Sequence, residues 1–270
     1  MRMKVDFNIK SKLSLLTPFV FPALILLVWW WVSVSNLVNP YLIPSPEEVF
    51  EAGRDLFLSG KLYLHTVASL KRALLGFSIT ALIATLLATI LYFIPVMESF
   101  LNFPLEFVRT TPPLAAIPLL ILWFGIGEGA KLAIIILASF FPIFLNTLDG
   151  LKNADANLLE MGKTLDLNRV EVFRFILLPA AIPSVITGLR LGFGYSWRAL
   201  IGAELVAASS GLGYMILDAE ELARTDYVFV GIMLIGGLGF VFDYLFKKAT
   251  DRIVLFLHLK ESFGGADGRY

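Results

Sequence analysis

Three consecutive residues, Gly162-Lys163-Thr164, match the end of a phosphate-binding loop, in which backbone N–H groups and a lysine hold the phosphates of a nucleotide. Such a loop has another glycine five residues before this one, and Asn157 stands at that position. The loop also follows a buried strand, whereas the preceding DANLLEM has the composition of a helix. We therefore expect no ATP site here. The alternatives are an inert loop and an element that docks onto another protein.

A second group of candidate functional residues consists of charged residues that lie inside an apolar run. Arg190, Arg198 and Glu204 interrupt a long apolar run, and charges that would lie in a bilayer mark functional sites by default. Arg198 and Glu204 are about 240° apart around a helix, so they do not pair locally. Arg190 is expected to snorkel or to pair with an acidic residue. A functional pathway and a structural cluster of charges both remain open.

The residue types needed for other chemistry are scarce. The chain has no Cys, which excludes disulfides and thiolate metal sites, and its two histidines, His65 and His258, are far apart. We expect both histidines to be interfacial or solvated, and we predict no catalytic residue, no metal site and no cofactor. The 22 Lys and Arg balance 22 Asp and Glu, so no basic field exists to attract nucleic acid.

The composition indicates that these residues lie in a membrane protein. The chain is 57% hydrophobic, has a mean hydropathy of +0.78, and contains 16% charged residues, whereas soluble domains contain about 25%. A helix needs about 20 apolar residues to cross the hydrocarbon core. Runs of this kind predict an all-α membrane protein with six transmembrane helices, at residues 18–35, Ala73–Val96, Thr110–Gly127, Leu132–Leu148, Ala180–Val206 and Tyr227–Phe242.

The segments that connect these runs also contain residues that predict local structure and orientation. The first run lacks a small-residue cleavage site, so it predicts a retained anchor. Ser45-Pro46-Glu47-Glu48 is a helix-start signal and predicts a short amphipathic helix on the membrane surface. The turn GEGAK joins the third and fourth runs into a hairpin. With a cytoplasmic N-terminus, inner segments hold 14 Lys and Arg and outer ones six, which favours cytoplasmic N- and C-termini.

The segment Asp149–Arg174 is the longest charged connection on the predicted cytoplasmic side. Asn168 followed by Glu171 is a capping box that restarts the chain in a new direction. Apolar positions recur at helical spacing on both sides of it and predict two short amphipathic helices, with Leu158, Met161, Gly162 and Leu165 in the first and Val170, Phe173 and Leu177 in the second.

The same segment carries a family signature. It resembles E-A-A-x3-G-x9-I-x-L-P of the permease subunits of binding-protein-dependent ABC importers, in which this coupling helix region seats in a groove of the cytoplasmic ATPase. The matching residues, which the resemblance assigns to ATPase coupling, are Glu160, Met161, Gly162, Asp166, Ile176, Leu178 and Pro179. Asp166 replaces the loop glycine, and Asp tolerates a positive φ better than most residues, so we expect the turn to survive.

The resemblance covers roughly residues 20 to 255. IPSPEEVF, RTTPPLAAIPLLILWFGIG and WRALIGAELVAASSGLGYMILDAEELARTDYVFVGI are similar to the nitrate, sulfonate and taurine branch of these permeases. The resemblance implies a type I ABC importer permease fold with a cytoplasmic coupling helix between helices 4 and 5. We divide the chain into three parts. Residues 1–60 hold the N-terminal cytoplasmic tail, the first helix and the external amphipathic segment. Residues 61–256 form the permease core, with the coupling segment at 149–179, and residues 257–270 form the C-terminal cytoplasmic tail.

Several residues are expected along a translocation pathway or at a gate. Pro112, Pro113 and Pro118 interrupt the third run, which favours a pore-lining segment over a simple kink without excluding the latter. Gly188 and Gly192 allow close approach of another helix, either in a second subunit or within this one. The residues that we assign to the translocation pathway or a gate, from these arguments and from the resemblance together, are Arg109, Pro112, Pro113, Arg190, Arg198, Glu204, Ser209, Ser210 and Gly211.

The resemblance implies a permease subunit in the inner (cytoplasmic) membrane of a prokaryotic cell, multi-pass and surrounded by lipid. Its expected partners are a second copy of the permease, two cytoplasmic ATPase subunits and an extracytoplasmic substrate-binding protein. It is a translocation subunit and not an enzyme. The expected substrate is a small anion, an aliphatic sulfonate, taurine or nitrate. The alternatives are an importer of another small solute such as a vitamin precursor, and a secondary transporter, for which no repeat is visible.

Overall fold

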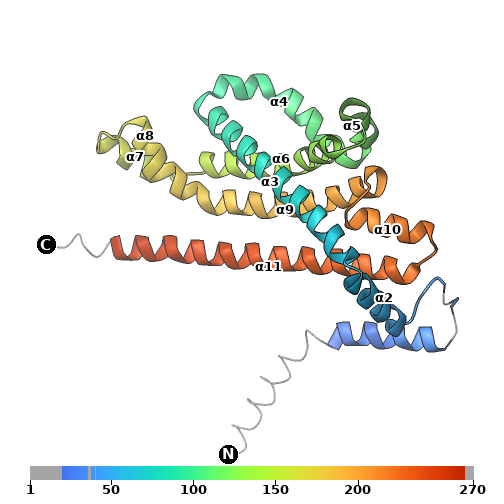
Figure 1. The fold of residues 1–270 in the computed structure, drawn as a ribbon. Coiled ribbons are helices and arrows are strands. Elements are labelled where there is room, and N and C mark those ends of the chain that lie inside the picture. Colours follow the sequence, from blue (N-terminus) through green and yellow to red (C-terminus); the bar gives the residue numbers. More distant parts are fainter. Residues whose placement is uncertain (1–19, 36–37, 40, 265–270) are drawn as a thin grey trace, which may run out of the picture. The chain divides into compact units, whose positions relative to one another are not determined.

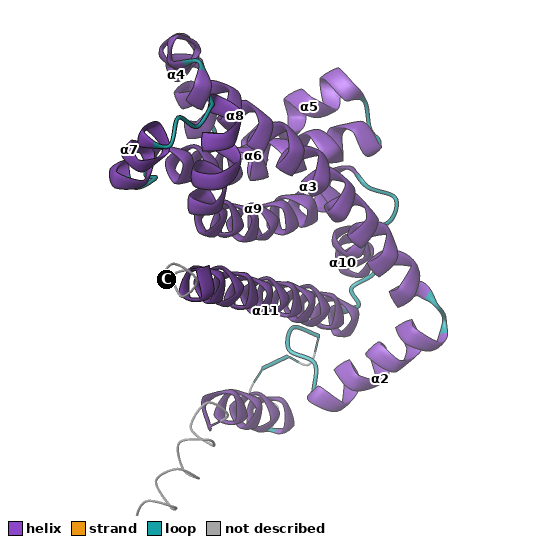
Figure 2. Ribbon diagram, turned by 90° about the vertical axis from the view of Figure 1, so that its left-hand side faces the viewer, coloured by secondary structure: helices purple, strands orange, loops and turns teal. Residues whose placement is uncertain are grey.

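The computed structural model describes residues 20–35, 38–39 and 41–264, and side chains from residue 254 onward are outside the description. Throughout this part of the chain the regular structure is helical (Figure 2). After a first helix at Val20–Val34 come α2 Pro46–Leu58, α3 Lys61–Phe93, α4 Pro95–Thr110, η1 Pro113–Ala116, α5 Ile117–Phe124, α6 Glu128–Lys152, α7 Ala156–Thr164, α8 Arg169–Val172, η2 Phe173–Leu177, α9 Leu178–Ala207, α10 Leu212–Glu221 and α11 Thr225–Gly264 (Figure 1).

The chain forms two compact units, each described here by itself. The first comprises residues 1–62 and 216–233. In it, Trp29 donates from Nε1 to the Pro44 carbonyl at 3.0 Å and stacks on Phe229 at 5.6 Å. Helix α2 begins at Ser45, whose side chain accepts from the Glu48 N–H while Glu48 accepts from the Ser45 N–H at 2.7 Å, so the predicted helix start is confirmed. Its position on a membrane surface stays a prediction.

The second unit comprises residues 63–215 and 234–270 and is organised around the contact of α6 with α9. The two helices lie side by side (Figures 1 and 2). A Cβ atom at Gly188 would lie 2.8 Å from the Asn146 Cβ and 3.0 Å from the Pro142 carbonyl oxygen. Only glycine therefore allows the α6 backbone to approach this closely. Of the two roles left open for the Gly188 and Gly192 pair, the structure supports packing within one subunit.

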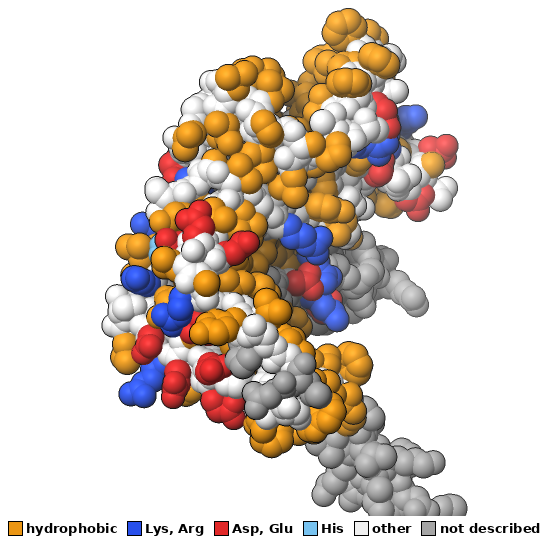
Figure 3. All heavy atoms as spheres, turned by 90° about the vertical axis from the view of Figure 1, so that its right-hand side faces the viewer, with side chains coloured by type: hydrophobic (Ala, Val, Ile, Leu, Met, Phe, Trp, Pro, Cys, Tyr) orange, Lys and Arg blue, Asp and Glu red, His pale blue; other side chains and the backbone are white. Residues whose placement is uncertain are grey.

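Four helical stretches are long and apolar enough to cross a membrane, namely Lys61–Phe93, Glu128–Lys152, Arg169–Ala207 and Thr225–Ile253. A fifth exists if α4 and the following segment Pro113–Phe124 count as one broken span, and Val20–Val34 is a shorter apolar helix. The predicted count of six is therefore not confirmed by the described residues. In the space-filling view hydrophobic side chains cover much of the face drawn, as expected for a chain that meets lipid (Figure 3).

The predicted third span, Thr110–Gly127, is wrong as a single straight helix. Helix α4 ends at Thr110, and α4 makes an angle of 89° with Pro113–Phe124. The residue before a proline is pushed out of the helical region, and Thr111 accordingly has φ −75° and ψ 122°. The prolines do interrupt the segment, as expected. A turn does follow, but it lies earlier than the expected GEGAK: α5 ends at Phe124, Gly125 caps it with φ +74°, and α6 already begins at Glu128.

Three other boundaries differ from expectation. Helix α3 begins at Lys61 rather than near Ala73, because the polar sequence before the apolar run is also helical. Helix α11 extends from Thr225 well beyond Phe242. The second amphipathic helix of the coupling segment is not a separate helix, because α8 continues through the π-helical turn η2 into α9 as one stretch, Arg169–Ala207. Pro179 lies directly after this π-helical turn, and both a proline and a π-helical turn locally disturb the regular hydrogen bonding of a helix.

The packing of α6 on α9 predicts opposite effects for two glycines of the same helix. Gly188→Ala should destabilise the protein by about 1–3 kcal/mol, because the new methyl group would overlap α6 backbone. Gly194→Ala is the matched control, since its Cβ would meet no atom within 4 Å and alanine favours a helix by up to about 1 kcal/mol. Thermal unfolding of the purified variants in detergent measures the difference. Equal melting temperatures would contradict the close contact.

Candidate functional site

A cluster of polar side chains, buried apart from the exposed Glu128 and the partly buried Ser210, joins α3, α6, α9 and the turn after α9. We call it the Glu204 network and define it as Ser69, Arg72, Glu128, Lys131, Glu204 and Ser210. Glu204 and Ser69 have no exposed surface, Arg72 is 9% exposed and Lys131 is 3% exposed. Two carboxylates and two cations make the network formally neutral, as expected when charges are buried.

The carboxylate of Glu204 is fully hydrogen-bonded. Arg72 donates from one terminal nitrogen to Glu204 Oε1 at 2.9 Å, the Ser69 hydroxyl lies 2.8 and 2.9 Å from the two carboxylate oxygens, and the Gly213 N–H donates at 3.0 Å. Donors from two separate helices, α3 and α10, therefore bind one buried anion, which offsets the cost of removing it from water.

Arg72 links Glu204 to two further groups. Its Nε and its second terminal nitrogen donate to the Glu128 carboxylate at 2.7 and 2.9 Å, and Lys131 donates to the same carboxylate at 3.0 Å. It also donates to the Ser210 carbonyl at 2.6 Å and to the Ser210 hydroxyl at 2.9 Å. The turn between α9 and α10 is thus held by a guanidinium that belongs to α3.

The glycines of that turn follow from the same contacts. Gly211 has φ +123°, and a Cβ atom there would overlap the Glu204 carboxylate. A Cβ at Gly213 would lie 2.6 Å from the Ile201 carbonyl oxygen. The Gly211 N–H donates to His65 Nδ1 at 3.1 Å, and the His65 ring lies 5.8 Å from that of Tyr214. The expectation of a solvated His65 is therefore wrong, since it is 9% exposed, and its position at a membrane interface stays a prediction. His258 lies outside the described side chains.

The structure brings some of the predicted gate residues together. Glu204, Ser210 and Gly211 lie in or beside the Glu204 network, while Ser209 is exposed on the same turn. Arg109 lies apart, in the last turn of α4, where it pairs with Glu106. Pro112 and Pro113 form the break between α4 and α5. Arg198 and Glu204 do not contact each other by any hydrogen bond or ion pair found in the described chain.

Sequence reasoning missed Ser69, Arg72, Glu128 and Lys131, because all four lie outside the apolar runs from which the helices were predicted. The sequence does contain a pattern that indicates some of these residues. His65, Ser69, Arg72 and Gly76 recur at helical spacing, so they line one face of an upstream extension of the helix. All four residues of this face are buried.

The turn after α7 has the predicted local structure. Asp166 has φ +52°, so it occupies the left-handed position expected of the residue that replaces glycine. The Leu167 N–H bonds the Gly162 carbonyl at 3.0 Å and the Asp166 N–H bonds the Lys163 carbonyl at 3.1 Å, which is a Schellman end for α7. The capping box of Asn168 with Glu171 is confirmed.

The signature residues of this segment divide into two groups. Gly162 and Ile176 are buried against each other, and a Cβ at Gly162 would lie 2.8 Å from Ile176 Cδ1. Pro179 is partly buried at the start of α9. The second group is exposed and includes Glu160, Met161 and Leu178. The neighbouring apolar residues Leu165 and Val170, which are not part of the signature, are exposed as well. The segment therefore presents an exposed apolar surface with charges around it.

Arg190 and Arg198 lie on α9 and line a cavity between α9 and α11. Arg190 binds Asp243 through two hydrogen bonds of 2.7 Å, so the expectation that it pairs with an acid is confirmed. Arg198 lies over the Tyr195 ring, with 5.8 Å from its guanidinium carbon to the ring centre.

The fold is shared with solved membrane transporters. The chain superposes on a chain of an amino acid ABC transporter with a TM-score of 0.58, at 20% identity, covering 76% of this chain and 94% of that one. The MetNI methionine ABC transporter gives a TM-score of 0.53 at 16% identity, covering 70% of this chain and 92% of that one. These likenesses define the class as the helical, membrane-spanning fold of ABC transporters.

The sequence identifies the family. Residues 79–254 match the model of the family described as "Binding-protein-dependent transport system inner membrane component", and the chain belongs to this family. It is a multi-pass membrane protein with a role in translocation. The expected resemblance is therefore confirmed.

Named relatives cover most of the chain. The putative aliphatic sulfonates transport permease protein SsuC of Bacillus subtilis is 36% identical over 241 residues, which are 89% of this chain and 84% of the relative. The taurine transport system permease protein TauC of Escherichia coli is 36% identical over 236 residues, which are 86% of each chain. The putative SsuC of Escherichia coli is 37% identical over 257 residues, which are 94% of this chain and 98% of the relative.

The Glu204 network predicts strong coupling between Arg72 and Glu204. Arg72→Met should destabilise the protein by about 3–5 kcal/mol, because it leaves a buried carboxylate without its cation. Adding Glu204→Gln should recover part of this loss, so the double variant is more stable than the sum of the single effects predicts. Thermal unfolding in detergent measures the cycle. Arg224→Met is the control, because its exposed pair with Asp226 is worth about 0–1 kcal/mol. Strict additivity would contradict the proposed pairing.

Proposed function

We propose that this chain is the permease subunit of an ATP-driven importer for small organic sulfonates, with taurine and short aliphatic sulfonates as the substrate class. The observation that carries the proposal is 36–37% identity, over most of the chain, to permeases named for aliphatic sulfonates and taurine. A substrate arrives on a separate extracytoplasmic binding protein, and the permease supplies the route through the membrane.

The coupling segment is the surface that we assign to the ATPase. Its exposed residues Glu160, Met161 and Leu165 lie on or just after α7, and the buried contact of Gly162 with Ile176 fixes α7 against the start of the long helix. A force applied to α7 would thus reach α9 through a packed contact instead of a loose loop. ATP hydrolysis belongs to separate subunits in this proposal.

The complete transporter in this proposal contains two copies of the permease, two ATPase subunits and the binding protein. The N- and C-termini and the coupling segment lie on the cytoplasmic side, as the Lys and Arg distribution favours. Closure of the ATPase dimer brings the two coupling segments together, and the helices rock to accept substrate from outside. Hydrolysis reverses the movement and completes uptake.

We assign the turn of Ser209, Ser210 and Gly211 to the external gate. Arg72 binds Ser210 through both its carbonyl and its hydroxyl, so the turn moves with α3 and α9. Arg109, Pro112 and Pro113 belong to the pathway side of the broken helix α4–α5, where a kinked backbone needs cover from protein or water. In this proposal the gate opens and closes with the movement of the helices, and its movement does not depend on the titration of a residue in the turn.

The substrate assignment predicts ATP-dependent uptake of a labelled sulfonate. The purified permease is reconstituted into vesicles with its ATPase and binding protein, and accumulation of taurine, a short alkanesulfonate, nitrate and a neutral vitamin precursor is compared. Taurine or the alkanesulfonate should accumulate only when ATP is present. Accumulation of the neutral solute alone would reject the substrate class, and uptake driven by an ion gradient without ATP would reject the importer.

The coupling assignment predicts that Glu160→Lys uncouples transport. The variant should insert and fold normally, because Glu160 is exposed on α7. Uptake per ATP hydrolysed should fall about tenfold or more, since the charge reversal lies in the surface assigned to the ATPase. Glu51→Lys reverses an exposed charge on α2 and should keep the normal ratio. A normal ratio for Glu160→Lys would remove Glu160 from the interface.

A further inference from the structure

Helix α2 of the first unit has three distinct sides. Val49, Ala52 and Leu56 form its buried side, which packs against the rest of the chain. Phe50 and Phe57 lie two turns apart on a second side, and they are 76% and 69% exposed. We call these two aromatic residues the Phe50 stripe. They give α2 an apolar surface that the chain itself does not cover.

The third side of α2 carries negative charge. Glu47, Glu51 and Asp55 recur every four residues, all three are exposed, and their mean direction lies about 110° around the helix from the Phe50 stripe. Arg54 is exposed between the stripe and these carboxylates, and its long side chain can reach from an apolar layer to a polar one. The helix therefore presents an apolar side and a charged side to its surroundings at the same time.

Neither water nor hydrocarbon alone suits this arrangement. With 13 residues, α2 is about 20 Å long and cannot span a hydrocarbon core of about 30 Å. Its carboxylates would be costly in hydrocarbon, and its two phenylalanines would leave apolar surface in bulk water. A helix that lies in the boundary between lipid headgroups and acyl chains satisfies both sides, because its apolar side enters the lipid and its charged side stays in water.

The helix Val20–Val34 indicates where this boundary lies. Residues 20–28 are apolar and every one of them is exposed, so this stretch has no polar side to turn towards water. Three tryptophans, residues 29–31, follow directly, and tryptophan is enriched at the level of the lipid headgroups. Trp30 donates from Nε1 to Glu47 Oε1 at 3.3 Å. Helix α2 therefore begins at the level that the tryptophans mark.

The same group of contacts reaches the start of α11, whose first residues belong to the same unit. The Trp29 ring stacks on Phe229. A Cβ atom at Gly53 of α2 would lie 3.6 Å from Val230 Cγ2. Both α2 and the tryptophans are therefore in contact with one end of a helix that is long and apolar enough to cross a membrane.

We propose that α2 binds the lipid surface on the side of the membrane where Val20–Val34 ends. In this arrangement the axis of α2 lies in the membrane plane, the Phe50 stripe enters the boundary between headgroups and acyl chains, and the carboxylates face water. The contact is apolar, because a side rich in carboxylates gives no attraction to anionic lipids. It holds the start of α11 at the membrane surface. The inference needs only the membrane location of the family and is independent of the proposed substrate.

The absence of Cys from the whole chain allows one nitroxide label to be attached at a chosen position. Phe50→Cys and Phe57→Cys place the label on the stripe, and Glu51→Cys and Asp55→Cys are matched controls on the charged side. All four native side chains are exposed, so the changes should leave the fold intact. The full chain is reconstituted into phosphatidylcholine vesicles. Electron paramagnetic resonance then measures collisions of each label with oxygen, which concentrates in lipid, and with a water-soluble nickel complex.

Labels on the Phe50 stripe should give an oxygen-to-nickel collision ratio severalfold higher than the labels at positions 51 and 55, because only the stripe enters lipid. Phe50→Asp should lower the ratio at position 57 towards that of the controls, since a carboxylate on the stripe opposes insertion. Equal ratios on the two sides of α2, or no effect of Phe50→Asp, would overturn the proposal. Few collisions with either reagent at position 57 would also overturn it, because a second copy of the chain or another protein would then cover the stripe.

Discussion

The burial of one carboxylate, that of Glu204, organises the end of the second unit. A buried carboxylate must be bound by donors or lose its charge, and here the donors come from α3 and from the start of α10. Arg72 can serve Glu204 only if α3 is helical well before its apolar run. The same guanidinium then fixes Ser210, so the conformation of the turn follows from the position of α3.

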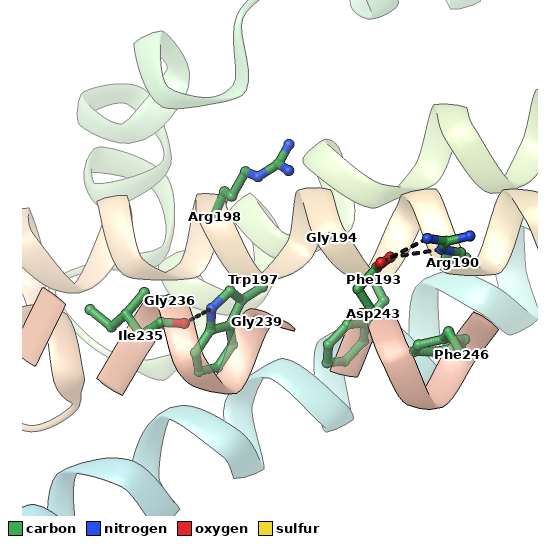
Figure 4. A pocket seen from close by; sticks show the side chains of 10 residues that line it. All are labelled: Arg190, Phe193, Gly194, Trp197, Arg198, Ile235, Gly236, Gly239, Asp243 and Phe246. Atoms are coloured by element: carbon green, nitrogen blue, oxygen red, sulfur yellow. Dashed lines mark hydrogen bonds and ion pairs between the residues drawn. The ribbon is translucent and has the colours of Figure 1, made fainter. Parts of the chain in front are cut away.

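Small residues determine how the remaining charges are distributed on α9. Gly188 and Gly192 give one face of α9 to α6, and Glu204 near its end is directed into the Glu204 network. Arg190 is therefore left on the side towards α11, where it meets Asp243 (Figure 4). The close packing of α9 on α6 and the charged cleft beside α11 therefore have one cause, namely which residues lie on which face of α9.

The sequence predicts most helices, because apolar runs, caps and glycines are local signals. In some places a few neighbouring residues decide the local backbone conformation. Examples are the capping boxes at Ser45 and Asn168 and the left-handed conformation of Asp166. The break at Thr111 was visible from its prolines, but the 89° angle depends on what α5 packs against. The Glu204 network needed contacts between residues more than 100 positions apart, and one sequence contains no direct measure of these.

The three charges of α9 differ in how completely the protein satisfies them. Glu204 is saturated with donors and has no exposed surface, so it stabilises one conformation and is poorly placed to bind a solute. Arg190 is paired but partly exposed, so its pair can be rearranged at moderate cost. Arg198 has only the Tyr195 ring beside it among the described contacts. Because a charge inside a membrane-spanning helix is costly when it is left alone, we expect the exposed side of α9 that carries Arg198 to face water or protein and not hydrocarbon.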